Sequence, residues 1–139
     1  MSKIAGKIKG ITIEIAGNTQ KLNKALEDVN KKTRDLQGEL RHVERLLKLD
    51  PKNTELLAQR QKLLAEQVEN SREKLTRLKA AQEQVNEAFQ RGEIDEEQYR
   101  AFQREVIKAE QELEKFEKQL KETGLTAERR CSNGGYPVF

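Results

Sequence analysis

Residues 46–57 read LLKLDPKNTELL, and this short stretch decides how the chain folds. Leucines surround a polar break at Asp50-Pro51, and a proline cannot continue the helix that precedes it. The same proline suits the first turn of a new helix, for which Asp50 supplies the N-cap. The stretch therefore predicts a helix-turn-helix hairpin, with one helix ending near Leu49 and the next beginning near Pro51.

Apolar residues on both sides of this break recur at alternating steps of four and three, and a third run with the same spacing follows. An average step of 3.5 residues places one narrow apolar seam along a helix, which is the coiled-coil pattern. We therefore expect helices near 19–49, 51–90 and 95–122 that pack along one another. The seam consists of Leu22, Leu26, Val29, Thr33, Leu36, Leu40, Val43 and Leu47, then Leu57, Gln61, Leu64, Val68, Ser71, Leu75, Leu78, Gln82, Val85 and Phe89, then Tyr99, Phe102, Val106, Ala109, Leu113, Phe116 and Leu120.

The third helix has a complete start signal. Asp95 is placed as the N-cap and Gln98 follows at N3, which is a capping box, while Ile94 and Tyr99 occupy the positions of a hydrophobic staple. Gly124 supplies a stop signal at the other end. The sequence after it shows no periodic apolar pattern, so we expect a disordered tail.

A strand is predicted before the first helix. Residues 11–15 read ITIEI, a strict alternation of β-branched isoleucines with polar residues. A lone strand leaves its backbone groups unpaired, so we expect it to fold back on residues 3–9, to pair with another chain, or to remain unpaired. Asn18 or Thr19 would then cap the first helix.

These elements define an all-α fold of three long, antiparallel, coiled-coil-like helices with a short N-terminal β-strand and a disordered C-terminal tail. The expected divisions are a strand segment at 1–17, a helical coiled-coil domain at 18–122 and an unstructured tail at 123–139. Apolar residues make up 35% of the chain and charged residues 37%. This composition fits thin helices better than a large globular core.

The net charge of +3 is unevenly distributed. Residues 1–49 carry 11 basic and 6 acidic groups, whereas residues 93–139 carry 8 and 11. This distribution predicts antiparallel contact between the first and third helices. It also raises the alternative of a nucleic-acid-binding coiled coil, but the two charge signs are interleaved and aromatic residues are scarce, so no specific nucleic-acid partner is expected.

The sequence predicts no catalytic, cofactor-binding or metal-binding residues, and therefore no enzyme. His42 is the single histidine and Cys131 the single cysteine, so neither has the partners that a metal site or a nucleophile requires. The lone cysteine also favours a reducing compartment such as the cytoplasm. No apolar stretch approaches the ~20 residues that a membrane span requires.

The seam and the strand instead point to assembly, because both present apolar surface to another element. We expect the chain to form a homo-oligomer. The residues predicted to mediate it are Ile11, Ile13, Ile15, Leu22, Leu26, Val29, Leu36 and Leu40.

Several of these segments resemble the N-terminal region of tail tape measure proteins from phages and prophages of Gram-positive bacteria. The likeness covers roughly residues 10–122 and is most specific between Val29 and Thr54. It rests on Ile11 to Ile15, on Thr19, Lys21 and Leu22, on Ala25 to Leu36, on Arg45 to Pro51, on Gly92 to Ile94 and on Glu96 to Tyr99.

This resemblance implies a structural protein that packs as helices inside the tail tube and helps to set the tail length. It implies tail tube, tail chaperone or baseplate proteins as partners, the host cytoplasm as the place of assembly, and the lumen of the virion tail as the final location. Whole tape measure proteins run to many hundreds of residues, so the resemblance implies one module of such a protein or a truncated prophage remnant. The alternative left open is a coiled-coil adaptor or scaffold unrelated to phages.

Overall fold

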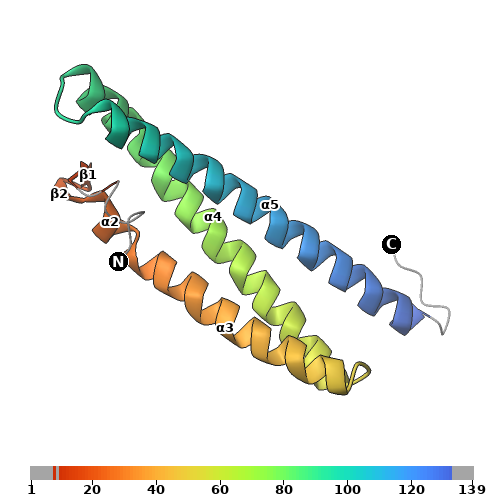
Figure 1. The fold of residues 1–139 in the computed structure, drawn as a ribbon. Helices are drawn as coiled ribbons and strands as arrows, with labels where there is room; N and C mark the ends of the chain where they lie inside the picture. Colours follow the sequence, from red (N-terminus) through yellow and green to blue (C-terminus); the bar gives the residue numbers. More distant parts are fainter. Residues whose placement is uncertain (1–7, 9, 133–139) are drawn as a thin grey trace.

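The computed structural model describes the backbone of residues 8 and 10–132, and the side chains of this part as far as Thr123. The elements in chain order are β1 (Thr12–Ile15), β2 (Asn18–Lys21), α2 (Leu22–Ala25), α3 (Glu27–Leu49), α4 (Thr54–Gln90) and α5 (Glu96–Ser132). Figure 1 shows α4 in the middle, with α3 along one side and α5 along the other. The predicted fold of three long antiparallel helices is confirmed.

The strand finds its partner immediately after it. β1 pairs antiparallel with β2, and the residues joining them, Ala16 and Gly17, have φ angles of +52° and +84°. Two consecutive positive φ angles make the two-residue turn that matches the twist of a hairpin. The prediction that residues 18 and 19 end the strand and cap a helix is therefore wrong, and the expected boundary at residue 17 lies inside the hairpin.

The helix ends also differ from the expected ones. The first helix begins at Leu22 instead of Thr19, and the chain breaks at Leu26 (φ −101°, ψ 0°) before α3 continues. At the first turn, Asn53 and not Asp50 is the cap, because its side-chain oxygen accepts a hydrogen bond from the Leu56 amide. The helix therefore begins at Thr54, after the proline and not with it.

The third helix starts as predicted. The Gln98 amide donates to Asp95 at 2.7 Å, and the Asp95 amide donates to the Gln98 side chain at 3.1 Å, which completes the capping box. Its predicted end near Glu122 is wrong, because α5 continues through Gly124 to Ser132. The part of the predicted tail that remains, residues 133–139, lies outside the described residues.

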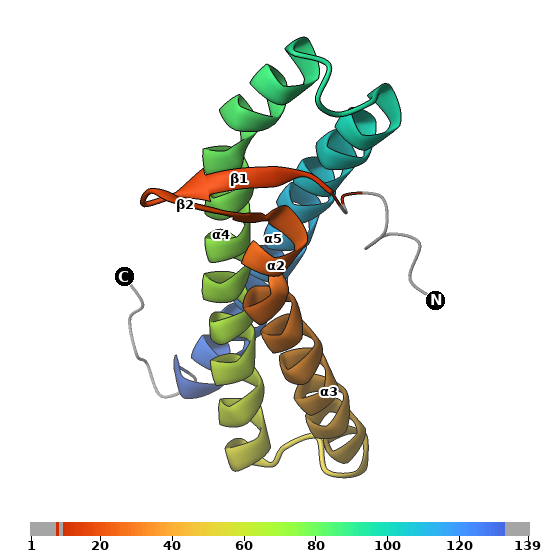
Figure 2. The ribbon, with the colours of Figure 1, turned by 90° about the vertical axis from the view of Figure 1, so that its left-hand side faces the viewer.

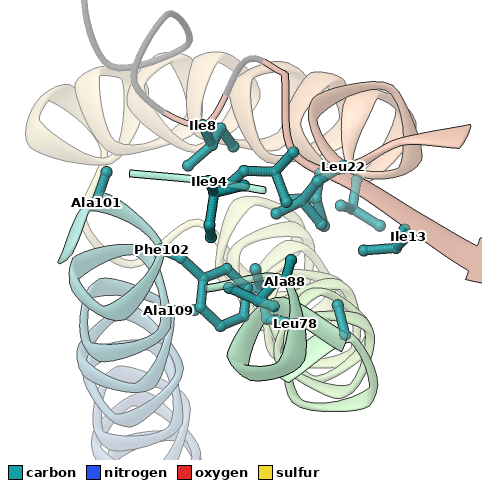
Figure 3. Packing of buried hydrophobic residues seen from close by; sticks show 14 residues of the cluster. Ile8, Ile13, Leu22, Leu78, Ala88, Ile94, Ala101, Phe102 and Ala109 are labelled. Atoms are coloured by element: carbon teal, nitrogen blue, oxygen red, sulfur yellow. The ribbon is translucent and has the colours of Figure 1, made fainter. Parts of the chain in front are cut away.

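The packing divides into two apolar cores. The hairpin-end core joins the hairpin to α2, α3, α4 and α5, and it is shown in Figure 3. The turn-end core lies toward the α3–α4 turn. The hairpin-end core consists of Ile8, Ile11, Ile13, Leu22, Leu26, Val29, Leu78, Ala81, Val85, Ala88, Ile94, Ala101, Phe102 and Ala109. The turn-end core consists of Leu36, Leu40, Val43, Leu47, Leu63, Leu64, Val68 and Phe116.

The charges pair differently from the expected pattern. Because α3 and α5 are each antiparallel to α4, they run parallel to each other, and antiparallel contact between the first and third helices is wrong. The acidic groups of α5 instead face basic groups of α4. The pairs are Arg72 with Glu117 at 3.1 Å, Lys74 with Glu105 at 3.9 Å and Lys79 with Glu110 at 3.2 Å.

Candidate assembly interface

The hairpin is the part of the chain with exposed backbone edges, and its local sequence explains its position. Alternation along the strand turns Ile11 and Ile13 into the hairpin-end core, where they are 0% and 3% exposed. Thr12 and Glu14 occupy the opposite, exposed face. Figure 2 shows the hairpin lying across α4, with its turn extending past that helix.

The outer edge of β1 is covered by one side chain of α4. The Glu14 amide donates to Gln84 Oε1, and Gln84 Nε2 donates to the Glu14 carbonyl at 3.0 Å. A primary amide presents a donor and an acceptor together, so Gln84 satisfies both backbone groups as a neighbouring strand would. This edge is therefore closed at Glu14.

A second side chain of α4 holds the break between α2 and α3. Arg77 donates to the Ala25 carbonyl at 2.8 Å and to both carboxylate oxygens of Asp28, at 2.7 and 3.2 Å. The hydrogen bond from Arg77, reinforced by its charge, holds the pKa of Asp28 below its usual range against a smaller opposing effect of burial. Arg77 also bonds Glu73 on its own helix at 3.0 Å, so it is fixed from both sides.

A polar layer separates the two apolar cores, and we define it as Thr33, Gln67 and Asn70. Asn70 Nδ2 donates to the Val29 carbonyl at 2.9 Å and to Thr33 Oγ1 at 2.8 Å, while Gln67 Nε2 donates to the Thr33 carbonyl at 3.3 Å. Asn70 is 7% exposed and Gln67 is 0% exposed. A buried amide that is satisfied in one alignment and unsatisfied in others fixes the register of paired helices.

Seven of the eight residues predicted to mediate oligomerisation lie in the apolar cores of this one chain. Packing within a single molecule is sufficient to explain why they are apolar, so their role in self-association stays a prediction. Ile15 is the exception, with 42% of its surface exposed. The seven are Ile11, Ile13, Leu22, Leu26, Val29, Leu36 and Leu40, each between 0% and 8% exposed.

Sequence reasoning missed the residues that position this site. Ala16-Gly17 carries a turn signal, because a glycine at the second turn position is typical of such hairpins, but the strand was predicted to end there. Gln84, Arg77 and Asn70 lie on a charged, polar helix where their spacing gives no separate signal. The predicted polar seam position Ser71 is 5% exposed, next to Asn70 in the chain.

The described residues show no group of three or more His, Cys, Asp or Glu side chains placed to hold a metal ion. Across the same part of the chain, no helix combines the length and apolar character that a bilayer span requires. A groove between α3 and α5 is lined by both charge signs, among them Glu27, Arg34, Lys108 and Glu112. Such mixed lining does not form a continuous phosphate-binding surface.

Two curated phage proteins are similar in sequence to this chain. One, named "Probable tape measure protein", comes from Lactococcus phage SK1 and is 32% identical over 126 residues, which is 91% of this chain and 12% of that protein. The other, named "Tape measure protein", comes from Lactococcus phage F4-1 and is 46% identical over 50 residues, which is 36% of this chain and 14% of that protein. The chain thus spans about an eighth of the length of these relatives. No protein-family model and no solved structure matches it.

Proposed function

Because this chain is a homologue of one region of the phage tail tape measure proteins, we propose that it acts as a structural module of the phage tail, through assembly and not through catalysis. The observation that carries the proposal is the 32% identity to the SK1 protein across 91% of the chain. A match of that extent includes α3, α4, the turns that join the three long helices and most of α5. It supports the phage role over an unrelated coiled-coil adaptor or a nucleic-acid-binding coiled coil.

The folded-back arrangement refines the role. A helix rises 1.5 Å per residue, so α4 with its 37 residues is ~55 Å long. The three long helices laid end to end would span ~145 Å. A segment that measures length spans the greatest distance per residue when it is fully extended. This module is folded back on itself, so it spans little more than the length of one helix. Its role is therefore to anchor one part of the tape measure and to organise its assembly.

The partners follow from this role. A module that anchors a tape measure contacts tail tube, tail chaperone or baseplate proteins, and further copies of itself. The host cytoplasm is the place of assembly, and the tail lumen is the final location. The exposed Ile15 at the hairpin supports a contact there, since the other seven predicted residues already pack within the chain.

The proposal is tested by replacing the matching region of the tape measure protein in Lactococcus phage SK1 with residues 11–122 of this chain. The expected result is infectious phage whose tails have normal length in electron micrographs. The control is an unrelated antiparallel coiled-coil hairpin of the same length in the same position. Loss of tails with the replacement, or equal rescue by the unrelated hairpin, would contradict the proposal.

The anchoring role is tested by inserting 14 residues into α4 and 14 facing residues into α5 of the replacement, which preserves their antiparallel pairing. A folded module becomes longer by ~21 Å and an extended one by ~42 Å. We expect tails that lengthen by no more than the smaller value. Lengthening by the larger value would show that the module is extended inside the tail.

A further inference from the structure

The hairpin end of the molecule has an acidic hollow between the hairpin and the last turns of α4, with a volume of about 610 Å³. Among its lining residues are Glu14 of β1, Glu87 of α4 and Glu93 just after α4. Arg91, also in the lining, pairs with Glu87 at 4.0 Å and with Glu93 at 3.1 Å. Glu14 has no ion pair in the described part of the chain, so three carboxylates share one cation here.

The opposite end, at the α3–α4 turn, is apolar and basic. Leu46 and Leu49, in the last turn of α3, are 37% and 84% exposed. Arg45 lies one helical turn before Leu49, Lys52 follows it in the turn, and both are exposed. Neither cation has an ion pair within the described residues. An apolar surface with a charged rim is the composition of a protein-binding patch.

Both features lie on the same face of the molecule. Arg77 of α4 contacts Asp28 of α3 at 2.7 Å, so these two residues mark the face. Leu49 follows Asp28 by 21 residues, which is three heptads, and therefore lies on the same side of α3. Gln84 follows Arg77 by one heptad on α4, lines the hollow and bonds to Glu14. Figure 2 shows the hairpin and the α3–α4 turn toward opposite ends of α4.

We propose that two copies of this chain pair side by side and antiparallel through this face, so that the basic turn end of each copy meets the acidic hollow of the other. The contact has two-fold symmetry and closes at two copies, because each copy offers the same pair of complementary surfaces. Arg45 and Lys52 of one copy then lie against Glu14 and Glu87 of the other. This inference rests on the proposed structural role, and it names the surface through which copies join.

The apolar side chains at the two ends fit the same arrangement. Ile15 is 42% exposed, and its neighbour Ala16 lines the hollow. Antiparallel pairing places Ile15 of one copy against Leu46 and Leu49 of the other, which removes all three from water. These are three of the four large apolar side chains that are exposed among the described residues. The contact therefore combines apolar burial with opposite charges at its rim, as stable interfaces do.

The shared face is large enough for a stable dimer. α4 has 37 residues and is ~55 Å long, and two neighbouring helices are ~20 Å wide, so the face measures about 1,100 Å². A standard interface buries about 800 Å² per partner. Near the middle of the face, charged groups already pair within each chain, as Arg77 does with Asp28 and Glu73, and Lys31 with Asp35. The two ends therefore decide how the copies align.

Cross-linking tests this alignment in the full chain, with Cys131→Ser as background. Chains carrying Ile15→Cys and chains carrying Leu49→Cys are mixed and treated with a short bismaleimide. Identical cysteines lie at opposite ends of the dimer, ~50 Å apart, so only the mixed pair can be joined. We expect at least about tenfold more mixed product than either self-product. Products in the statistical ratio of random collision would overturn the proposal.

The matched control is Ile107→Cys, at a residue of α5 that is 51% exposed and therefore as accessible as Ile15. The proposed face consists of α3, α4 and the hairpin, so α5 lies outside it. Mixed with Leu49→Cys, the control should give no more product than random collision. A yield equal to that of Ile15→Cys would also overturn the proposal.

Sedimentation equilibrium tests the charge complementarity. Raising the salt from about 0.1 M to about 1 M shortens the Debye length from about 10 Å to about 3 Å and should weaken the dimer. Arg45→Glu combined with Lys52→Glu should weaken it by about tenfold or more, because attractive pairs become repulsive ones. The control with the same change of charge is Arg104→Glu with Lys118→Glu, at exposed positions of α5, and it should leave the dimer intact.

Adding Glu14→Lys and Glu87→Lys to the turn-end reversal exchanges the charges of the two ends. This variant should recover the dimer, with circular dichroism confirming that it is folded. A parent chain that stays monomeric in low salt, a series of ever larger species, equal weakening by the α5 control, or no recovery in the exchanged variant would overturn the proposal. These tests use the purified chain and not the phage replacement, so this inference and the proposed function fail separately.

Discussion

The two ends of the molecule are built from the same repeating seam and yet pack differently. The hairpin-end core takes buried side chains from the hairpin and from every helix, whereas the turn-end core takes them from α3 and α4 and a single one, Phe116, from α5. At the hairpin end, Phe89 and Tyr99 stack across the α4–α5 turn with ring centroids 4.4 Å apart, and Ile94 between the helices is 7% exposed. At the other end, Leu49 beside the α3–α4 turn is 84% exposed.

This difference shows that a seam specifies the buried face of each helix but not how many neighbours share it. α4 packs against both other long helices, while α3 and α5 have their main helix contacts with α4. The hairpin adds the extra apolar side chains that close one end. We therefore expect the hairpin end to be the more stable half and the turn end to open first.

The largest expected effect comes from Phe102→Ala in the hairpin-end core. Phe102 is 1% exposed and points from α5 toward Leu78, Ala88 and Ile94 in Figure 3. Removing its ring should lower the free energy of unfolding by ~3–5 kcal/mol. The measurement is urea denaturation followed by circular dichroism.

The matched variant at the other end is Phe116→Ala, since Phe116 is 3% exposed and is likewise contributed by α5. We expect a smaller loss, because fewer elements surround this ring and the site can relax around the truncated side chain. Equal losses at the two positions, or a larger one at Phe116, would show that the two ends are equally well packed.

The next effect concerns the polar layer between the two cores. Asn70→Ala removes two hydrogen bonds to α3 and should destabilise the chain by ~1–3 kcal/mol. Asn70→Leu should cost less stability, because an apolar side chain suits the surrounding seam, but it should allow other registers and partner numbers. Sedimentation velocity is expected to show a mixture of oligomers for the leucine variant and a single species for the alanine variant. A uniform species for both would mean that Asn70 does not set the register.

The sequence was sufficient to predict the three helices, their antiparallel order and the cap at Asp95, because each depends on a local signal. The 3.5-residue spacing identified the buried faces, and the proline and capping box identified the turns. The predicted helix start at Thr19 is wrong, because this residue lies in β2. Only two residues separate β2 from β1, so the two strands pair as a hairpin. The helix continues through Gly124 because glycine permits a stop but does not force one.

The assembly site was less predictable for a physical reason. Gln84 closes an edge by bonding to Glu14, 70 residues away, and Arg77 bonds to Asp28, 49 residues away. Such contacts depend on how two elements lie in space, and a hydrophobic pattern contains no information about them. The role of Ile11 and Ile13 was hidden in the same way, since their burial depends on the hairpin folding onto α4.

A smaller effect compares the caps of the two turns. Asp95 takes part in a reciprocal capping box with Gln98, whereas Asn53 accepts one hydrogen bond from the Leu56 amide. Replacing either cap with alanine should cost ~0.5–2 kcal/mol. We expect Asp95→Ala to be the costlier one, because the bond that it removes, from the Gln98 amide to a charged carboxylate, is 2.7 Å long, against 3.0 Å for the bond from the Leu56 amide to Asn53. Thermal unfolding of the two variants measures the difference. A larger loss for Asn53→Ala would contradict the view that the hairpin end is the better fixed half.

The smallest effect is a dependence of the hairpin end on pH, through the ion pair of Arg77 with Asp28. The folded pKa of Asp28 is lowered chiefly by its hydrogen bond from Arg77, so the pair stabilises the fold at pH values above the unfolded carboxyl pKa of about 3.9. That contribution is lost as the pH falls through the folded value. Asp28→Asn should therefore be slightly less stable than the parent chain at pH 7, and this difference in stability should disappear near pH 2.

Because the Asp28 side chain is 72% exposed, salt should also reduce the difference in stability. Asp35→Asn, which replaces another exposed acid of α3 paired with Lys31, is the control for removing a surface charge. A gap that persists at acid pH would mean that Asp28 acts through packing or helix capping, and that Arg77 holds the α2–α3 break through the Ala25 carbonyl alone.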